Sequence, residues 1–225
     1  MPVTELVFRE EDHTYWMGEQ LIPNVTRVLE RITDYSRIPR DVLLRAQTEG
    51  RHIHKAVELD ARNDLDWETL PEWMIGHLEA WRKFQHDTRF EILASEERLF
   101  HPRFRYAGTL DLVGPLSTVM SLIDIKRSFY AGPAINLQTA AYADAYRAIH
   151  PKAPRIRRRF GLQLRANGTY RLEPFDEEDD IQAFLAYLTC YRWEQKHGYG
   201  STAIRPDRAV GAAADGRRDE EFAAS

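Results

Sequence analysis

Cysteine is almost absent from this chain of 225 residues, which contains only Cys190. One cysteine cannot form a disulfide within the chain, and it excludes metal or iron-sulfur sites built from cysteine alone. Long apolar runs are missing too, since no stretch approaches the roughly 18 apolar residues of a membrane helix. The opening MPVTELVFREEDHTYW lacks the basic-then-apolar pattern of a secretion signal. We therefore expect an intracellular protein in a reducing compartment, with Cys190 as a buried helical thiol.

The chain also lacks an excess of positive charge, because its formal net charge is -4 at pH 7. Proteins that coat nucleic acid through bulk electrostatics are strongly basic, so any contact with DNA must come from a local patch. The segment RIRRRF is one candidate, since strand alternation would place Arg155, Arg157 and Arg159 on one face. A solvated edge strand protected by its charges is the alternative interpretation.

Internal repeats of solenoid length are absent as well. The length suits a single domain with its own hydrophobic core. We divide residues 1–200 of that domain into an N-terminal hairpin with a short helix (1–38), a helical part (39–90) and a core (91–200). Residues 201–225, rich in Ala, Gly, Arg and Asp, are predicted to form a flexible tail.

The spacing of apolar residues predicts a mixture of helices and strands. Residues 5–23, with turn signals at REEDH and Gly18, are predicted to form a hairpin or a three-strand meander. Helical spacing covers 23–32 (with Asn24 as N-cap), 39–62, 67–90, 133–150 and 176–198. Period-two alternation predicts strands at 91–102, 104–114, 119–128, 155–165 and 168–175, with turns at Gly114-Pro115 and Asn167-Gly168.

Two of these helices carry notable residues. Gly50 lies inside the second helix, where glycine is unfavourable, and this indicates close packing or a local break. Residues 67–90 carry four large apolar side chains on overlapping faces, a pattern more typical of a core than of a cofactor site: Trp73, Leu78, Trp81 and Phe84.

Two adjacent predicted strands each contain a carboxylate, Asp111 in one and Asp124 in the other. Burying a charge in a strand is costly unless it is paired or bound to a metal. Antiparallel pairing of the strands would bring both carboxylates to one end of the sheet, where they repel unless a cation lies between them. All-oxygen ligation of this kind suits Mg²⁺ or Mn²⁺.

Lys126 follows Asp124 by two residues, so on a strand both side chains point to the same face. A lysine there could hold a metal-bound water or offset the charge of a phosphate in a transition state. A metal ion, its bound water and a lysine together form a centre suited to phosphodiester hydrolysis. An Asp124–Lys126 ion pair on an exposed strand face, with Asp111 in a turn, is the alternative.

Helical positions add four further candidates. Gln138 and Tyr142 are four residues apart and share a helix face, where they could bind a substrate strand or belong simply to core and surface. His54 and Glu58 are likewise four apart, and His54 could supply a nitrogen ligand that Glu58 orients. A lone helical histidine is more often structural.

Six ordered blocks of the sequence resemble the PD-(D/E)xK nuclease superfamily, in its RecB-like, phage-type exonuclease branch. The blocks are HTYWMGEQLIPNVTRVL, GRHIHKAVE, AGTLDLVG, LIDIKRS, LQTAAYADAY and LQLRANGTYRLEPF. The resemblance implies an α/β (α+β) class and a restriction-endonuclease-like fold, in which helices flank a mixed central sheet, with an N-terminal hairpin and helical additions.

The resemblance also implies roles for individual residues. Asp111 and Asp124 would bind the metal, and Lys126 would be the catalytic lysine. His54 and the backbone carbonyl of Ile125 would be additional ligands. Gln138 and Tyr142 would form the accessory helix motif. The residues themselves, apart from the resemblance, add candidate accessory acids and candidate DNA contacts, with a plain surface charge as the alternative for Arg127. The acids are Glu58 and Glu97, and the DNA contacts are Arg127, Ser128, Arg155, Arg157 and Arg159.

The sequence departs from the family pattern at a few positions. Leu110 stands where a proline often precedes the first aspartate, and Arg127 and Ser128 follow Lys126 where many phage relatives have threonine. The single cysteine excludes relatives that carry an iron-sulfur cluster.

The resemblance implies a Mg²⁺-dependent deoxyribonuclease of the phage exonuclease type, with Mn²⁺ as a substitute ion, that hydrolyses DNA phosphodiester bonds in recombination, replication or repair. Its partners would be DNA and a single-strand annealing or other recombination protein, in the cytoplasm of a bacterium or a phage-infected cell. A catalytically silent DNA-binding scaffold and a structure-specific endonuclease are the alternatives.

Overall fold

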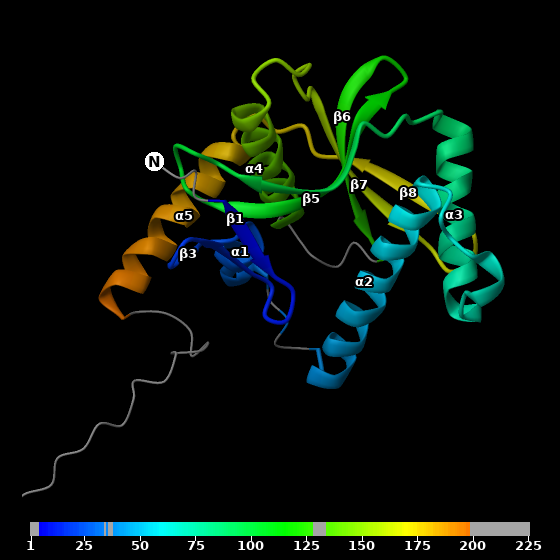
Figure 1. Cartoon of the computed structure of the whole chain (residues 1–225), viewed down its shortest axis with the longest axis horizontal. Coiled ribbons are helices and arrows are strands. Elements are labelled where there is room, and N and C mark those ends of the chain that lie inside the picture. The colour runs from blue at the N-terminus through cyan, green and yellow to red at the C-terminus, as the bar shows by residue number, and fades with distance from the viewer. Residues whose placement is uncertain (1–4, 34, 36–37, 128–133, 199–225) are drawn as a thin grey trace, which may run out of the picture.

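The computed structural model describes residues 5–33, 35, 38–127 and 134–198, and these form two sheets with flanking helices. The larger sheet has the order β4-β5-β6-β7-β8, in which only β6 and β7 run parallel (Figure 1). A smaller antiparallel sheet has the order β1-β2-β3. The strands are β1 Leu6–Arg9, β2 Thr14–Met17, β3 Gln20–Ile22, β4 Ala94–Phe100, β5 Ala107–Leu116, β6 Val119–Lys126, β7 Arg158–Leu164 and β8 Tyr170–Pro174.

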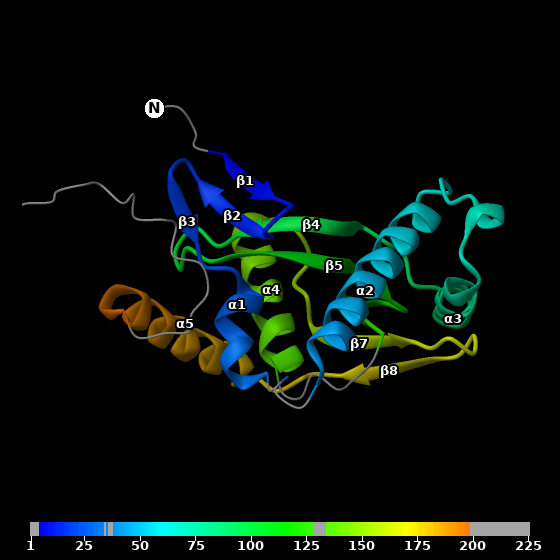
Figure 2. The ribbon, with the colours of Figure 1, turned by 90° about the horizontal axis from the view of Figure 1, so that it is seen from below.

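Helices cover both faces of the large sheet, as the two views in Figures 1 and 2 show. One apolar cluster joins α1, α4 and α5 to the sheet, and a second joins α2 and α3 to the other face. The helices are α1 Val25–Leu29, α2 Arg40–Ala61, α3 Glu72–Thr88, α4 Ala134–Ile149 and α5 Asp180–His197, with short 3-10 turns at Glu30–Ile32 and Trp67–Thr69. In the described part of the chain, no helix has the length and apolar character needed to cross a bilayer.

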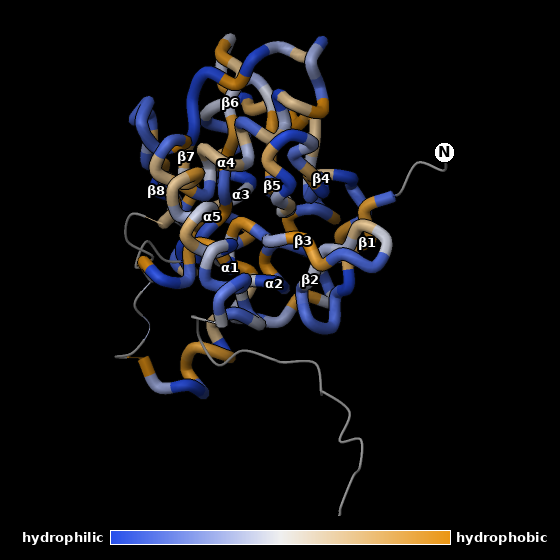
Figure 3. The backbone as a smooth tube through the Cα atoms, turned by 90° about the vertical axis from the view of Figure 1, so that its left-hand side faces the viewer, coloured by the Kyte–Doolittle hydropathy of each residue, from blue (hydrophilic) through white to orange (hydrophobic). Residues whose placement is uncertain are grey.

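The small sheet is fixed to the start of β5. Tyr15 and Ile22 pack on Ala107, whose N–H donates to the carbonyl of Pro23. Asn24 caps α1, since its side chain accepts a hydrogen bond from the N–H of Arg27. Figure 3 shows hydrophobic residues along the central strands and hydrophilic ones in the turn between β1 and β2. This arrangement brings Tyr15, far away in sequence, next to the strand that carries Asp111.

The structure confirms the mixed α/β class, the central sheet flanked by helices and the N-terminal meander. The predicted turn at Gly114-Pro115 is wrong, because both residues lie in β5 and pair with Ser121 and Met120 of β6. The chain turns instead after Leu116, where Ser117 adopts a positive φ.

Two other predictions are also wrong. Cys190 is exposed on α5, since that helix turns its buried residues Phe184 and Leu188 to the core. Gly50 marks neither close packing nor a break, because α2 runs through it and a methyl group there would meet no atom within 4 Å. The predicted tail at 201–225 lies outside the described residues.

The two glycines inside the long helices should respond in opposite ways to alanine. Gly50→Ala should raise the free energy of unfolding by about 0.5–1 kcal/mol, because it removes the cost of helical glycine and meets open space. Gly76→Ala should lower it by about 2 kcal/mol or more, because its Cβ would lie 1.8 Å from the carbonyl oxygen of Ala166. Urea unfolding of both variants beside the wild type measures this, and equal effects would contradict the packing described.

Candidate active site

Asp111 and Asp124 lie side by side at the centre of the large sheet. Leu112 of β5 pairs with Ile123 of β6 in an antiparallel register. Asp111, which precedes Leu112, therefore lies opposite Asp124, which follows Ile123. Asp111 is 8% exposed and Asp124 1% exposed, and the Oδ2 of Asp111 accepts a hydrogen bond of 2.6 Å from the N–H of Ile125. The predicted proximity of the two carboxylates is therefore present in the fold.

Lys126 provides a positive charge at this point, with its Nζ 2.6 Å from the Oδ2 of Asp124. The Oδ1 of Asp124 is buried and has no hydrogen-bond partner among the described residues. Burial raises the pKa of Asp124 to about 6, with Lys126 opposing the rise and Asp111 adding to it. A buried carboxylate oxygen without a hydrogen-bond partner has lost its hydration without compensation. A cation bound next to Asp124 would supply that compensation.

His54 reaches the aspartates from α2, the helix that lies over this face of the sheet. Its Nε2 lies 3.0 Å from the carbonyl oxygen of Ile125. Its Nδ1 lies 3.5 Å from both the Oε1 of Glu96 and the Oδ1 of Asp111. Burial by itself lowers the pKa of His54, but the two carboxylates outweigh it and raise the pKa to about 10. Without a metal, a protonated His54 therefore offsets part of the negative charge.

Glu96 of β4 belongs to this group although sequence reasoning selected its neighbour Glu97. Ser95 pairs with Leu112 and Glu97 with Leu110, so Glu96 stands opposite Asp111. The backbone of Glu96 has φ +49°, an uncommon conformation for a residue with a side chain. Burial raises the pKa of its carboxyl group.

Glu97 does not join the group. Its Oε1 lies 2.5 Å from Nε2 of His150, the residue that follows α4. The signal that distinguishes the two glutamates is the register of β4 against β5, which is not visible from the sequence of either strand alone.

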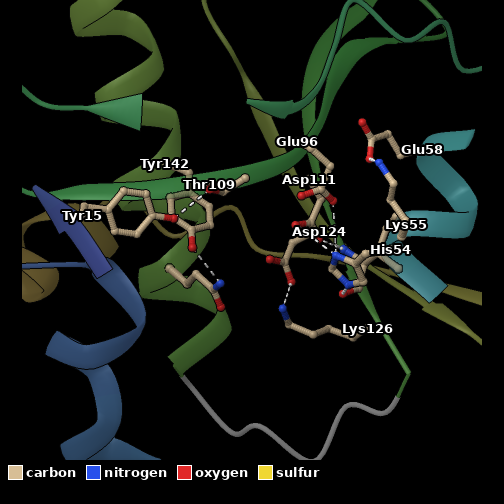
Figure 4. Close-up of polar contacts among 12 residues, drawn as sticks. Tyr15, His54, Lys55, Glu58, Glu96, Thr109, Asp111, Asp124, Lys126 and Tyr142 are labelled. Carbon is tan, nitrogen blue, oxygen red and sulfur yellow. Dashed lines mark hydrogen bonds and ion pairs between the residues drawn. The ribbon is translucent and has the colours of Figure 1, made fainter. Parts of the chain in front are cut away.

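Figure 4 shows the resulting cluster, in which Glu96, Asp111 and Asp124 come from three adjacent strands. Glu96 and Asp111 face His54, whereas the carboxylate of Asp124 points to Lys126. One ligand atom from each of His54, Glu96 and Asp111 can be chosen so that all lie within 4.8 Å of one another. Carboxylate oxygens with an imidazole nitrogen form a donor set suited to a divalent cation. The residues present thus fit a bound metal ion.

The helix α4 adds a polar pair beside the aspartates. The Nε2 of Gln138 donates to the hydroxyl of Tyr142 at 3.1 Å, and burial raises the pKa of that hydroxyl. The ring of Tyr142 approaches the backbone of Gly108 so closely that a Cβ there would lie 2.5 Å from Cε1. The hydroxyl of Tyr15 contacts Thr109 at 2.7 Å on the same side of the cluster (Figure 4).

The remaining candidates lie outside the cluster or make other contacts. Glu58 forms ion pairs with Lys55 of α2 and with Arg62, the residue that caps this helix. Arg127 pairs with Glu49 of the same helix. Ser128 lies outside the described residues.

The segment RIRRRF is not one strand face, since β7 begins only at Arg158. Arg155 and Arg157 are exposed before it. Arg159 is bonded within the chain, to Asp180 at 2.7 Å and to the carbonyls of Asn136 and Glu177. The predicted common face of the three arginines is therefore wrong.

No protein-family model and no curated protein match the chain. Among solved structures, a protein from Eubacterium rectale assigned as an exonuclease is 13% identical with a TM-score of 0.47, over 71% of this chain and 70% of its own. An alkaline exonuclease from Laribacter hongkongensis is 12% identical with a TM-score of 0.38, over 79% of this chain and 92% of its own.

The charge of His54 gives the metal-free protein a specific pH dependence. Because its folded pKa is raised from 6.5 to about 10, its stabilising contribution is complete below pH 6.5 and is lost as the pH rises towards 10. In EDTA, the wild type should be more stable than His54→Gln at pH 6.5, and the difference should shrink by pH 9.5. Urea unfolding of both proteins at the two pH values measures it; a difference independent of pH would contradict the assigned contacts.

Proposed function

We propose that this protein is a metal-dependent DNA nuclease that hydrolyses phosphodiester bonds in the manner of the RecB-like, phage-type exonucleases that its sequence resembles. The observation that carries the proposal is the buried pair Asp111 and Asp124, with Lys126 at 2.6 Å from one of them. Burying two carboxylates lowers the stability of the fold unless they have a further role. In a metal-dependent nuclease they have that role, because they hold the ion that activates the water.

In the proposed reaction, the residues of the chain hold and orient the reacting groups. A divalent cation bound here would polarise the phosphate and lower the pKa of an attacking water. Asp111 and Asp124 supply oxygen ligands. Lys126, already at the edge of the site, holds the water or offsets negative charge on the phosphate as it develops.

The polar pair on α4 extends the site towards the substrate. The hydroxyl of Tyr142 and the amide of Gln138 lie beside the aspartates and can donate hydrogen bonds to a nearby phosphate or base. Gly108 permits this arrangement, because any side chain there would displace the tyrosine ring.

Mg²⁺ is the ion we propose for the reaction, with Mn²⁺ as a substitute, and linear DNA is the proposed substrate. A role in recombination, replication or repair, together with a single-strand annealing partner, follows from the resemblance. An exonuclease requires a DNA end and leaves closed circular DNA intact, whereas a structure-specific endonuclease does not require an end.

The central test compares a buried ion pair with an exposed one. Asp124→Asn and Lys126→Ala should each lower the rate of DNA hydrolysis by about a hundredfold to a thousandfold, because each removes a group next to the reacting phosphate. The control is the surface pair Lys83 and Asp87, 3.0 Å apart on α3. Lys83→Ala and Asp87→Asn should leave the rate unchanged.

The assay uses linear DNA labelled at the 5′ or 3′ end, beside a closed circle, with Mg²⁺ or with EDTA. We expect degradation of linear DNA only, and only with the metal. Wild-type activity in Asp124→Asn and Lys126→Ala would refute the proposed centre. Binding of DNA without any cleavage, unaffected by EDTA, would instead identify a scaffold.

A further inference from the structure

We infer that Glu96, the Nδ1 of His54 and Asp111 form a cation site that binds Mn²⁺ more tightly than Mg²⁺, the ion proposed for the reaction. In this site the carbonyl of Ile125 orients His54 instead of binding the ion. This inference deepens the proposed function and rests on it for the use of the metal. It changes the ligand set that the sequence predicts, because it adds Glu96 and moves Ile125 out of the coordination sphere.

The two nitrogens of His54 have different surroundings, and this difference decides which one faces a cation. Nε2 lies 3.0 Å from the carbonyl oxygen of Ile125, a geometry in which this nitrogen carries the hydrogen and donates it. Nδ1 faces two carboxylates, those of Glu96 and Asp111, both at 3.5 Å. A metal-bound imidazole commonly donates its other N–H to a backbone carbonyl, which fixes the ring. His54 already has this arrangement.

The carbonyl of Ile125 accepts a hydrogen bond from His54 and so acts as a partner of the histidine, whereas the family pattern makes it a metal ligand. The N–H of the same residue donates to the Oδ2 of Asp111 at 2.6 Å. The peptide groups of Ile125 therefore hold two members of the proposed ligand set. Its role is to position His54 and Asp111.

Glu96 is placed in the site by the backbone. The register of β4 and β5 sets it opposite Asp111, and its φ of +49° costs about 1–3 kcal/mol for a residue with a side chain. Glu97, one residue further, forms its contact with His150 instead. The chain thus contains two adjacent glutamates of which only one faces His54.

A separate observation also points to a cation at this position. The neighbouring Asp124 is 1% exposed, and its Oδ1 has no hydrogen-bond partner among the described residues. Together with Glu96 and Asp111, it adds a third carboxylate to a site whose cationic groups are Lys126 and His54. A divalent ion would compensate the excess of negative charge that these two side chains leave.

The spacing and the nitrogen donor indicate which ion fits. Ligand atoms at about 2.1 Å from an octahedral ion lie about 3 Å apart when adjacent and about 4 Å apart when opposite, so separations of 3.5 Å need only small shifts. An imidazole nitrogen suits transition metals better than Mg²⁺, which prefers oxygen ligands and retains waters. Mn²⁺ accepts the carboxylates and the nitrogen together.

The experiment measures Mn²⁺ binding to the metal-free full-length chain by calorimetry, with Mg²⁺ as competitor. Glu96→Gln removes one charged ligand, and Glu97→Gln is the matched control with the same change one residue away. We expect Glu96→Gln to weaken Mn²⁺ binding by about tenfold or more, and Glu97→Gln to leave it within about twofold. Equal affinities for Mn²⁺ and Mg²⁺ in the wild type would overturn the choice of metal.

A second variant shows whether a loss of Mn²⁺ affinity reflects the missing ligand or a folding defect. Glu96→Gly also removes the ligand, but glycine adopts positive φ without strain, so this variant should be at least as resistant to urea as the metal-free wild type. Both Glu96 variants must lose Mn²⁺ affinity. Wild-type affinity in either one, an equal loss in Glu97→Gln, or no Mn²⁺ binding by the wild type would overturn the inference.

DNA cleavage by the same preparations separates this inference from the proposed function. If the wild type degrades DNA and Asp124→Asn does not, while Glu96→Gln still binds Mn²⁺ like the wild type, the inference fails and the nuclease remains. If Mn²⁺ binding depends on Glu96 but no DNA is cleaved under any condition, the site stands and the proposed function fails.

Discussion

The burial of two carboxylates on adjacent strands, Asp111 and Asp124, is the constraint on which the rest of the structure depends. Neighbouring carboxylates out of contact with water repel each other and lose their hydration, so each requires a compensating charge or hydrogen bond. Lys126 and the N–H of Ile125 supply part of this compensation within the strand β6. His54 adds a positive charge from α2. A divalent ion bound at Nδ1 would replace the proton of His54, take over this compensation and supply the chemistry that we propose.

The packing on each face of the sheet holds these groups in place. Ile53 and Val57 of α2 lie in the apolar cluster on one face, and they fix the helix that carries His54. On the other face, Leu137 and Ala141 of α4 fix the helix that carries Gln138 and Tyr142. The charged cluster therefore lies between two packed apolar layers, with Asp111 and Asp124 buried and with His54, Glu96 and Lys126 partly exposed. Electrostatic interactions are strongest at the two buried aspartates.

Most of the fold and the centre of the site were predictable because their signals are local. Asp111 and Asp124 lie on consecutive strands, so their antiparallel pairing follows from chain order alone. Glu96 was missed because a register between strands decides which of two adjacent glutamates faces Asp111. Cys190 was misplaced because the apolar residues around it do not define one clear helix face, and only α4 and α5 packing selects it. The turn at Ser117 was missed since β5 continues through a proline.

The most direct measurement of the central claim is anomalous diffraction at the manganese absorption edge from crystals of the full-length protein soaked in Mn²⁺. We expect an ion within bonding distance of Asp111, in contact with Asp124 or with Nδ1 of His54 and Glu96. The carbonyl of Ile125 should still accept from His54. A soaked crystal with no anomalous peak at these carboxylates, or with ions only at surface acids, would contradict a metal centre between β4, β5 and β6.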